Sequence, residues 1–239
     1  MKGWLAASGA KTALICGTGL ALDWRPEEAQ SFEQVAGLNL PTTVSHKGQI
    51  ETGQAAGAPL IQVRGRLHAY ETGSTAAMWP LYSLLAEAGV TRVIISGAVG
   101  SLDPDLPPGA LAQINDHLFF GGASPLVGKP HAFIEMAGAY QPWPGALPKA
   151  TYAWTHGPHL ETAAEIRALK AMGAHVVGMS MAPEVSMARY LGLEVFGLAA
   201  AVNWATGQGP ASSLQEMLGH AADASKKLPQ VLEPILSAG

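Results

Sequence analysis

Between Tyr152 and Asn203 the chain repeats one pattern: a short apolar segment ends in small or polar residues, and a helical segment follows. Alternation of apolar strands with helices predicts an α/β fold with a largely parallel sheet. The carboxyl ends of parallel strands lie at one edge of such a sheet, where open α/β folds bind their ligands. The polar residues that follow these strands are therefore the first candidates for a binding site.

The same pattern extends over the rest of the chain. We expect one α/β domain over residues 1–239, with a central mixed, largely parallel twisted β-sheet flanked by helices. The expected strands are Thr12–Gly17, Pro59–Gly65, Arg92–Gly97, Ala110–Ile114, Tyr152–His156, His175–Met179 and Glu194–Val202. The expected helices are Ser74–Ala88, Thr162–Met172 and Glu184–Leu191, and Gly121–Pro148 is expected to form a long surface loop.

Composition and charge narrow the class of function. Hydrophobic residues make up 48% of the chain and charged residues only 13%, which predicts extensive burial, including contacts between subunits. The net charge of −4 and the lack of a basic run argue against nucleic-acid binding. The single cysteine, Cys16, fits a reducing compartment, and no apolar run reaches the ~20 residues of a membrane helix. We therefore expect a cytoplasmic protein that is not inserted in a membrane.

Two segments in the first half of the chain could hold an anion. Gly17-Thr18-Gly19 follows a strand, so its amides and the Thr18 hydroxyl could surround an oxyanion, although a tight turn would need the same glycines. Arg66 and His68 lie two residues apart after another strand, so in extended geometry both side chains point to the same side. A guanidinium beside an imidazole suits a phosphate or carboxylate, and the alternative is a surface pair between Arg66 and Glu71.

Three polar residues in the second half lack a clear structural role. Thr162 and Glu165 form a plausible helix capping box, which leaves Glu161 as either a favourable charge near a helix start or an acceptor for a ring N–H. Ser180 could cap the next helix or bind phosphate. Asn203 ends an apolar strand, where an unpaired carboxamide would be costly, so a ligand partner is favoured.

The sequence gives no support to a metal site or to several common catalytic motifs. The eight histidines show neither H-x-x-x-H nor H-E-x-x-H spacing, and Cys16 has no second cysteine as a partner. We expect neither a metal nor an organic cofactor.

In this order, the candidate segments resemble the trimeric purine nucleoside phosphorylase family, which includes the methylthioadenosine phosphorylases. The resemblance runs from about Thr12 to the C-terminal helix. Its most specific parts are Gly65–Glu71, Ser96–Leu102 followed by Pro108-Gly109, Gly157–Glu165, Gly178-Met179-Ser180 with Pro183-Glu184-Val185, and Asn203. The resemblance implies a nucleoside phosphorylase-like fold, a homotrimer, and cleavage of a purine nucleoside by inorganic phosphate, which serves as a co-substrate.

The resemblance also implies a role for each candidate residue. Phosphate would be held by Thr18, His46, Arg66, His68, the Ala98 amide and Ser180. The sugar and base would be contacted by Tyr70, Leu160, Glu161, Met179, Asn203 and Leu214, and by Phe133 entering a neighbouring subunit's site. Asn203, Glu161 and His68 would act in catalysis. An ionised Glu161 accepts from the N1–H that 6-oxopurines carry and adenine lacks, so the expected substrate is of the inosine or guanosine type.

Two departures from the family pattern leave the substrate open. Leu160 replaces a base-stacking aromatic residue, and Leu214 falls where many members have a histidine that meets the ribose 5′-hydroxyl. An apolar residue there resembles the methylthio-nucleoside branch, so 5′-methylthioinosine or methylthioadenosine is an alternative substrate, whereas Tyr70-Glu71 favours the ordinary nucleoside branch. A hydrolytic nucleosidase and a catalytically weak nucleoside-binding protein are the other hypotheses.

Overall fold

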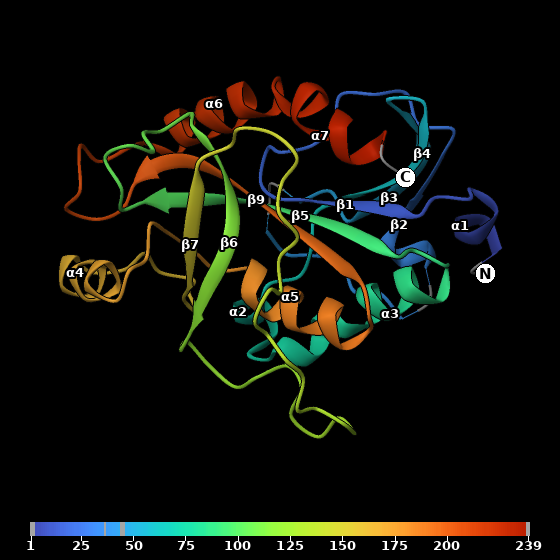
Figure 1. Cartoon of the computed structure of the whole chain (residues 1–239), viewed down its shortest axis with the longest axis horizontal. Helices are drawn as coiled ribbons and strands as arrows, with labels where there is room; N and C mark the ends of the chain where they lie inside the picture. The colour runs from blue at the N-terminus through green and yellow to red at the C-terminus, as the bar shows by residue number, and fades with distance from the viewer. Residues whose placement is uncertain (1–2, 36, 44–45, 238–239) are drawn as a thin grey trace.

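The computed structural model describes residues 3–35, 37–43 and 46–237. Its central feature is a mixed β-sheet in the order β2-β3-β4-β1-β5-β8-β7-β6-β9, with an additional β5–β9 pairing. This last pairing closes β5, β8, β7, β6 and β9 into a ring, and β1 to β4 extend the sheet from it (Figure 1). The strands are β1 Thr12–Cys16, β2 Glu28–Ser31, β3 Gln49–Ala55, β4 Ala58–Arg64, β5 Arg92–Ser101, β6 Leu111–Phe119, β7 Lys149–Trp154, β8 Val176–Gly178 and β9 Glu194–Trp204.

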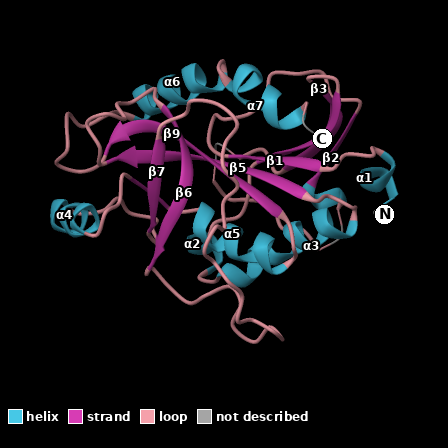
Figure 2. Cartoon of the chain, viewed as in Figure 1, coloured by secondary structure: helices cyan, strands magenta, loops and turns pink. Residues whose placement is uncertain are grey.

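Helices cover both faces of this sheet (Figure 2). They are α1 Gly3–Ala7, α2 Ala69–Thr72, α3 Trp79–Glu87, α4 Ala163–Ala171, α5 Met181–Tyr190, α6 Leu214–Ser225 and α7 Leu228–Leu236, with 3₁₀ turns at Phe32–Gln34 and Thr75–Met78. One core cluster joins the strands to α3 and α5, and a second joins the other face to α6 and α7. A third, smaller cluster packs α4 through Ile166 against β7 and β8.

The prediction of a largely parallel sheet is only partly confirmed. Parallel pairings join β1 to β4 and β5, β5 to β9, and β7 to β6 and β8. Antiparallel pairings join β3 to β2 and β4, β8 to β5, and β9 to β6. The β2 and β3 strands, which form the antiparallel edge, were not predicted from the sequence. Both carry many polar residues, so they lack the continuous apolar run of a doubly buried strand.

The expected elements otherwise lie close to their predicted positions. The α4 helix begins after Thr162, and Thr162 and Glu165 form the predicted capping box. The α5 helix starts at Met181, three residues before the predicted start, because Pro183 is compatible with a first helical turn. The described structure has no helix or strand between β6 and β7, where the long loop was predicted. Hydrogen bonds from Trp79 to Pro125 and from Tyr190 to Pro130 attach this loop to the helical layer.

The topology brings several strand ends to one place. The β1, β4, β5 and β9 strands are linked by parallel pairings. The β8 strand pairs antiparallel with the last two residues of β5, Gly100 and Ser101. The register between β5 and β9 shifts between Val99 and Gly100, so that Gly100 lies opposite Asn203. Such irregularities re-aim side chains and are common beside functional sites.

Candidate active site

A cavity of about 220 Å³ opens at these strand ends and is bordered by α6. The candidates that line it are Thr18, His46, Arg66, His68, Tyr70, Ala98, Leu160, Glu161, Met179, Ser180, Asn203 and Leu214. Phe133 does not line it and is fully exposed on the loop between β6 and β7. Residues from both halves of the chain therefore share one space, as the sequence analysis expected.

The floor of the cavity depends on glycines that allow close backbone contact. A Cβ atom on Gly17 would lie 2.8 Å from the Cα of Gly97 and 3.2 Å from the amide nitrogen of Ala98. The Gly17 amide also donates to the Ser96 hydroxyl at 3.2 Å. The turn that carries Thr18 therefore lies directly against β5. This close contact explains why glycine stands on both sides of it, at Gly17 and at Gly97.

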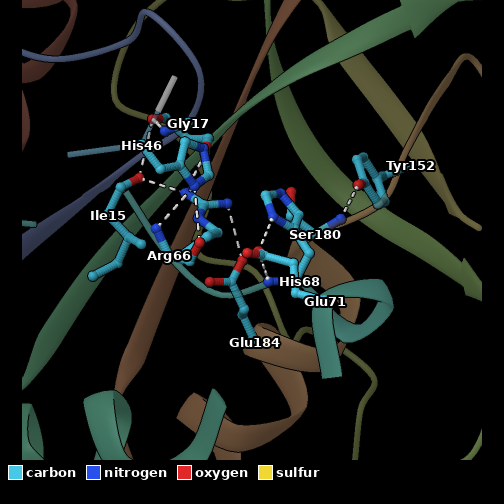
Figure 3. Close-up of polar contacts among 10 residues, drawn as sticks. Ile15, Gly17, His46, Arg66, His68, Glu71, Tyr152, Ser180 and Glu184 are labelled. Atoms are coloured by element: carbon cyan, nitrogen blue, oxygen red, sulfur yellow. Dashed lines mark hydrogen bonds and ion pairs between the residues drawn. The ribbon is translucent and has the colours of Figure 1, made fainter. Parts of the chain in front are cut away.

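Arg66 is buried and is bonded mainly to the protein itself (Figure 3). Its Nη1 donates to Glu184 at 3.0 Å, and its Nη2 donates to the carbonyls of Ile15 and Ser96 at 2.9 and 2.6 Å. The alternative of a surface pair with Glu71 is therefore wrong. Since both Nη2 hydrogens are used, neither edge of the guanidinium is free for two-pronged binding, and Arg66 contributes its charge to the cavity wall.

His68 is oriented by Glu71. The carboxylate Oε1 lies 3.0 Å from His68 Nδ1 and accepts the His68 amide at 2.7 Å, while Oε2 accepts from the Thr42 amide and hydroxyl. Burial acts to raise the pKa of Glu71, but these hydrogen bonds outweigh it and hold the pKa well below its usual value. An ionised Glu71 fixes the proton on Nδ1, which leaves Nε2 of His68 for a ligand in the cavity.

Three aromatic rings are stacked along this wall of the cavity. The centroids of His46 and His68 are 5.0 Å apart, and those of His68 and Tyr70 are 4.8 Å apart. His46 Nδ1 contacts the backbone of Arg66, and its buried Nε2 has no partner among the described residues. Burial lowers the pKa of His46 to about 4, so the ring is neutral at physiological pH.

Ser180 occupies the N-cap position of α5, but its hydroxyl makes no capping hydrogen bond. Its amide donates to the Tyr152 hydroxyl at 3.0 Å, and burial raises the pKa of Tyr152 to about 12. A Cβ atom on Gly97 would lie 3.5 Å from the Ser180 hydroxyl. The capping alternative is therefore wrong for the side chain, and the hydroxyl lies beside the small residues of β5.

Glu161 and Asn203 add further hydrogen-bond acceptors and donors to the lining of the cavity. The buried Glu161 accepts a 2.6 Å hydrogen bond from Thr155 on Oε1. Asn203 donates from Nδ2 to the backbone carbonyl of Trp204 at 2.8 Å. One N–H and the carboxamide oxygen of Asn203 remain for a ligand, because the described residues give that oxygen no partner.

The wall formed by α6 is apolar. Leu214, Met217, Leu218 and Ala221 all line the cavity, and Leu214 is 71% exposed. His220 does not line it, and its Nδ1 is hydrogen-bonded to the carbonyl of Val202 at 2.9 Å. The described part of α6 therefore brings no imidazole to the cavity in place of the histidine that many family members have at the position of Leu214.

Several residues that support the site were not assigned a role from the sequence. Glu184 pairs with Arg66, Glu71 orients His68, and Thr155 contacts Glu161. Glu184 and Glu71 lie within two segments that carry the family resemblance, Pro183-Glu184-Val185 and Gly65–Glu71. Thr155 is a polar residue directly after a strand. Met217 and Leu218 were missed because the cavity-lining face of a helix cannot be identified without the position of its neighbours.

The described residues contain no group of three or more His, Cys, Asp or Glu side chains placed to hold a metal ion. None of their helices combines the length and apolar character needed to cross a bilayer.

Comparisons with known proteins agree with this geometry. The family described as "Phosphorylase superfamily" matches residues 11–237. The chain is 31% identical to purine nucleoside phosphorylase 1 of Bacillus subtilis, over 82% of this chain and 80% of the relative. It is 34% identical to the purine nucleoside phosphorylase of Mus musculus, over 81% of this chain and 75% of the relative.

Solved structures show the same fold. A Schistosoma purine nucleoside phosphorylase in complex with guanosine superimposes with a TM-score of 0.82 at 25% identity, covering 96% of this chain and 90% of that chain. The structure of a Schistosoma purine nucleoside phosphorylase with hypoxanthine gives a TM-score of 0.83 at 24% identity, with 98% and 95% covered. This chain belongs to the phosphorylase superfamily and, within it, to the purine nucleoside phosphorylase family.

Proposed function

We propose that this protein is a purine nucleoside phosphorylase, a pentosyltransferase that cleaves 6-oxopurine nucleosides with inorganic phosphate. The products are the free base and ribose 1-phosphate. One observation carries the proposal: His68, Ser180, Glu161 and Asn203 all line a single cavity. The relatives named above carry the same activity in their names, and two related structures contain hypoxanthine or guanosine, which are a 6-oxopurine and its nucleoside.

The phosphate would occupy the side of the cavity that is rich in donors. Thr18, the Ala98 amide, His68 and Ser180 supply hydrogen-bond groups there, Arg66 supplies positive charge, and the unpartnered Nε2 of His46 lies beside them. Phosphate is an anion with several acceptor oxygens, so this set suits it in both charge and hydrogen bonding.

The base would lie against Glu161 and Asn203. As the C1′–N9 bond breaks, positive charge develops on the sugar and negative charge on the departing purine, and a phosphate oxygen then bonds to C1′. The remaining N–H of Asn203 can donate to N7 or to the 6-oxo group, which disperses the negative charge, and Glu161 accepts from N1–H. Preorganised donors of this kind contribute roughly 3–4 kcal/mol each in comparable enzymes. Tyr70 and Met179 would contact the sugar, and Leu160 would border the base.

The decisive experiment measures hypoxanthine release from inosine with and without inorganic phosphate. The proposal expects release only with phosphate, together with formation of ribose 1-phosphate. Release without phosphate would identify a hydrolytic nucleosidase instead. Stabilisation by inosine without turnover would identify a nucleoside-binding protein.

A second candidate substrate is supported by the α6 wall. Leu214, Met217 and Leu218 offer no hydrogen bond to a ribose 5′-hydroxyl but would contact a methylthio group. Under this variant of the proposal, 5′-methylthioinosine or methylthioadenosine replaces inosine. Comparing kcat/KM for inosine, guanosine, adenosine and 5′-methylthioinosine decides between them.

We propose further that the chain acts as one domain, in a cytoplasmic homotrimer, and without a cofactor. Support for the single domain is that strands from both halves of the sequence share one sheet. Support for the trimer is that Phe133 is fully exposed and does not line its own cavity, as expected of a residue that enters a neighbour's site. The only cysteine, Cys16, is free and buried, which fits a reducing compartment.

A further inference from the structure

The hydrogen bond between Thr155 and Glu161 reaches a cavity residue from a side chain that does not line the cavity. Thr155 directly follows β7 and does not line the 220 Å³ cavity. It lines a separate cavity of about 360 Å³, together with Trp154, His156 and Glu165. Glu161 lines both cavities.

We infer that Thr155 is a positioning residue that fixes Glu161 for recognition of 6-oxopurines, an inference that rests on the proposed function. The Thr155 hydroxyl donates to Oε1 of Glu161 at 2.6 Å, within the range of charge-assisted O–H···O⁻ bonds. A hydroxyl has a single hydrogen, so this bond uses the one donor that Thr155 offers. No described side chain donates to Oε2, which leaves that oxygen for a ring N–H.

The position of Thr155 is itself fixed by the sheet. Its amide donates to the carbonyl of Gly178 at 3.0 Å, which ties it to the end of the strand that precedes Met179 and Ser180. Glu161 lies in the connection between β7 and α4, where the backbone is not held by a strand ladder. The Thr155–Glu161 bond closes this connection, so that the carboxylate is attached to the sheet by a side chain as well as by the chain itself.

This arrangement would select the hydrogen-bonding pattern of the base. Because the threonine hydroxyl donates, Glu161 is held as an acceptor towards the cavity. An acceptor suits the N1–H of hypoxanthine or guanine and opposes the unprotonated N1 of adenine. Without the hydroxyl, the carboxylate could rotate towards the cavity of about 360 Å³, where water would solvate it and compete with the base.

The test uses Thr155→Val, which keeps the shape and removes the hydroxyl, and Thr155→Ser, which keeps the hydroxyl. Thr151→Val is the matched control, because Thr151 lies on β7, the strand that leads to Thr155, and lines neither cavity. Calorimetry with hypoxanthine and steady-state kinetics with inosine and phosphate are measured for each. Thr155→Ala supplies a second removal of the hydroxyl should valine prevent folding.

We expect Thr155→Val to weaken hypoxanthine binding and raise the KM for inosine by roughly 3- to 10-fold, the range of one net hydrogen bond. The KM for phosphate should stay unchanged, and Thr155→Ser and Thr151→Val should behave like the wild type. In a Glu161→Gln background, Thr155→Val should cause no further loss of hypoxanthine affinity.

Three results would overturn the inference while the proposed function stands: unchanged hypoxanthine binding in Thr155→Val, an equal rise in the phosphate KM, or a full additional loss in the Glu161→Gln background. A wild-type protein that neither binds hypoxanthine nor cleaves inosine would overturn the proposed function and the inference together.

Discussion

The buried pair between Arg66 and Glu184 gives a prediction whose size follows from its surroundings. The two side chains are 2% and 0% exposed, and Nη1 lies 3.0 Å from Oε2. Burial raises the pKa of Glu184, and the adjacent guanidinium of Arg66 opposes that rise. Since arginine stays protonated, Glu184→Gln would leave a buried positive charge without its counter-charge while preserving the volume of the side chain.

Removing one partner of a buried ion pair costs about 3–5 kcal/mol of folding stability. The lower part of that range is expected here, because the carbonyls of Ile15 and Ser96 still accept from the guanidinium. For a chain of this length, each kcal/mol shifts the melting temperature by about 2–4 °C, so a loss of about 3–4 kcal/mol in Glu184→Gln should lower Tm by about 6–16 °C. The KM for phosphate should change as well, because Arg66 lines the cavity.

The matched control is the exposed pair between Arg92 and Glu194, whose side chains are 20% and 49% exposed at a distance of 3.2 Å. Glu194→Gln should cost at most about 1 kcal/mol, because exposed pairs are weak. Urea unfolding and thermal unfolding of both variants, at one protein concentration and at low and high salt, provide the comparison. The loss in Glu184→Gln should be insensitive to salt. If Glu184→Gln is no less stable than Glu194→Gln, the pair does not neutralise a buried charge and this reasoning fails.

Three further predictions concern the two sides of the cavity. Asn203→Ala should lower kcat for phosphorolysis by roughly 10²–10³, because it removes a donor to the departing base; near-normal turnover would refute that role. Leu214→His should raise the kcat/KM ratio of inosine to 5′-methylthioinosine, and an unchanged ratio would mean that residue 214 does not meet the 5′ group. The depressed pKa of Glu71 means that its bonds to His68 and Thr42 stabilise the fold above about pH 4.5 and are lost as the pH falls towards its folded-state pKa. Glu71→Gln should therefore flatten the acid limb of stability measured by urea unfolding from pH 6 to pH 3, and an unchanged limb would contradict the assignment.

The parts of the fold that the sequence predicted well are those where one physical signal dominates. The β1, β4 and β9 strands are mostly apolar, and a capping box at Thr162 marks the start of α4. The β2–β3 edge was missed because both strands carry many polar residues and so lack an apolar run. The closure of the ring by the β5–β9 pairing was not predicted either, because strand order depends on contacts far apart in the chain.

Within the site, the sequence identified the groups that face the cavity but not those that hold them. Arg66, His68 and Glu161 were predicted because they are polar residues at strand ends. Their partners could not be assigned, because Glu184 lies 118 residues from Arg66, and neither Glu71 nor Thr155 differs in type from an ordinary surface residue. Proximity in the folded chain, rather than residue type, gives these side chains their roles.

This difference also bears on how a site with few charged residues could perform the proposed phosphorolysis. Three groups at the cavity are each held by a partner that does not line it: Arg66 by Glu184, His68 by Glu71, and Glu161 by Thr155. Fixed groups need little reorganisation when charge develops in the transition state, which is the main source of electrostatic catalysis. Glu184, Glu71 and Thr155 do not line the cavity. Their substitution should therefore alter the affinity for substrate and the orientation of the cavity groups, without changing the chemistry of the groups that touch the substrate.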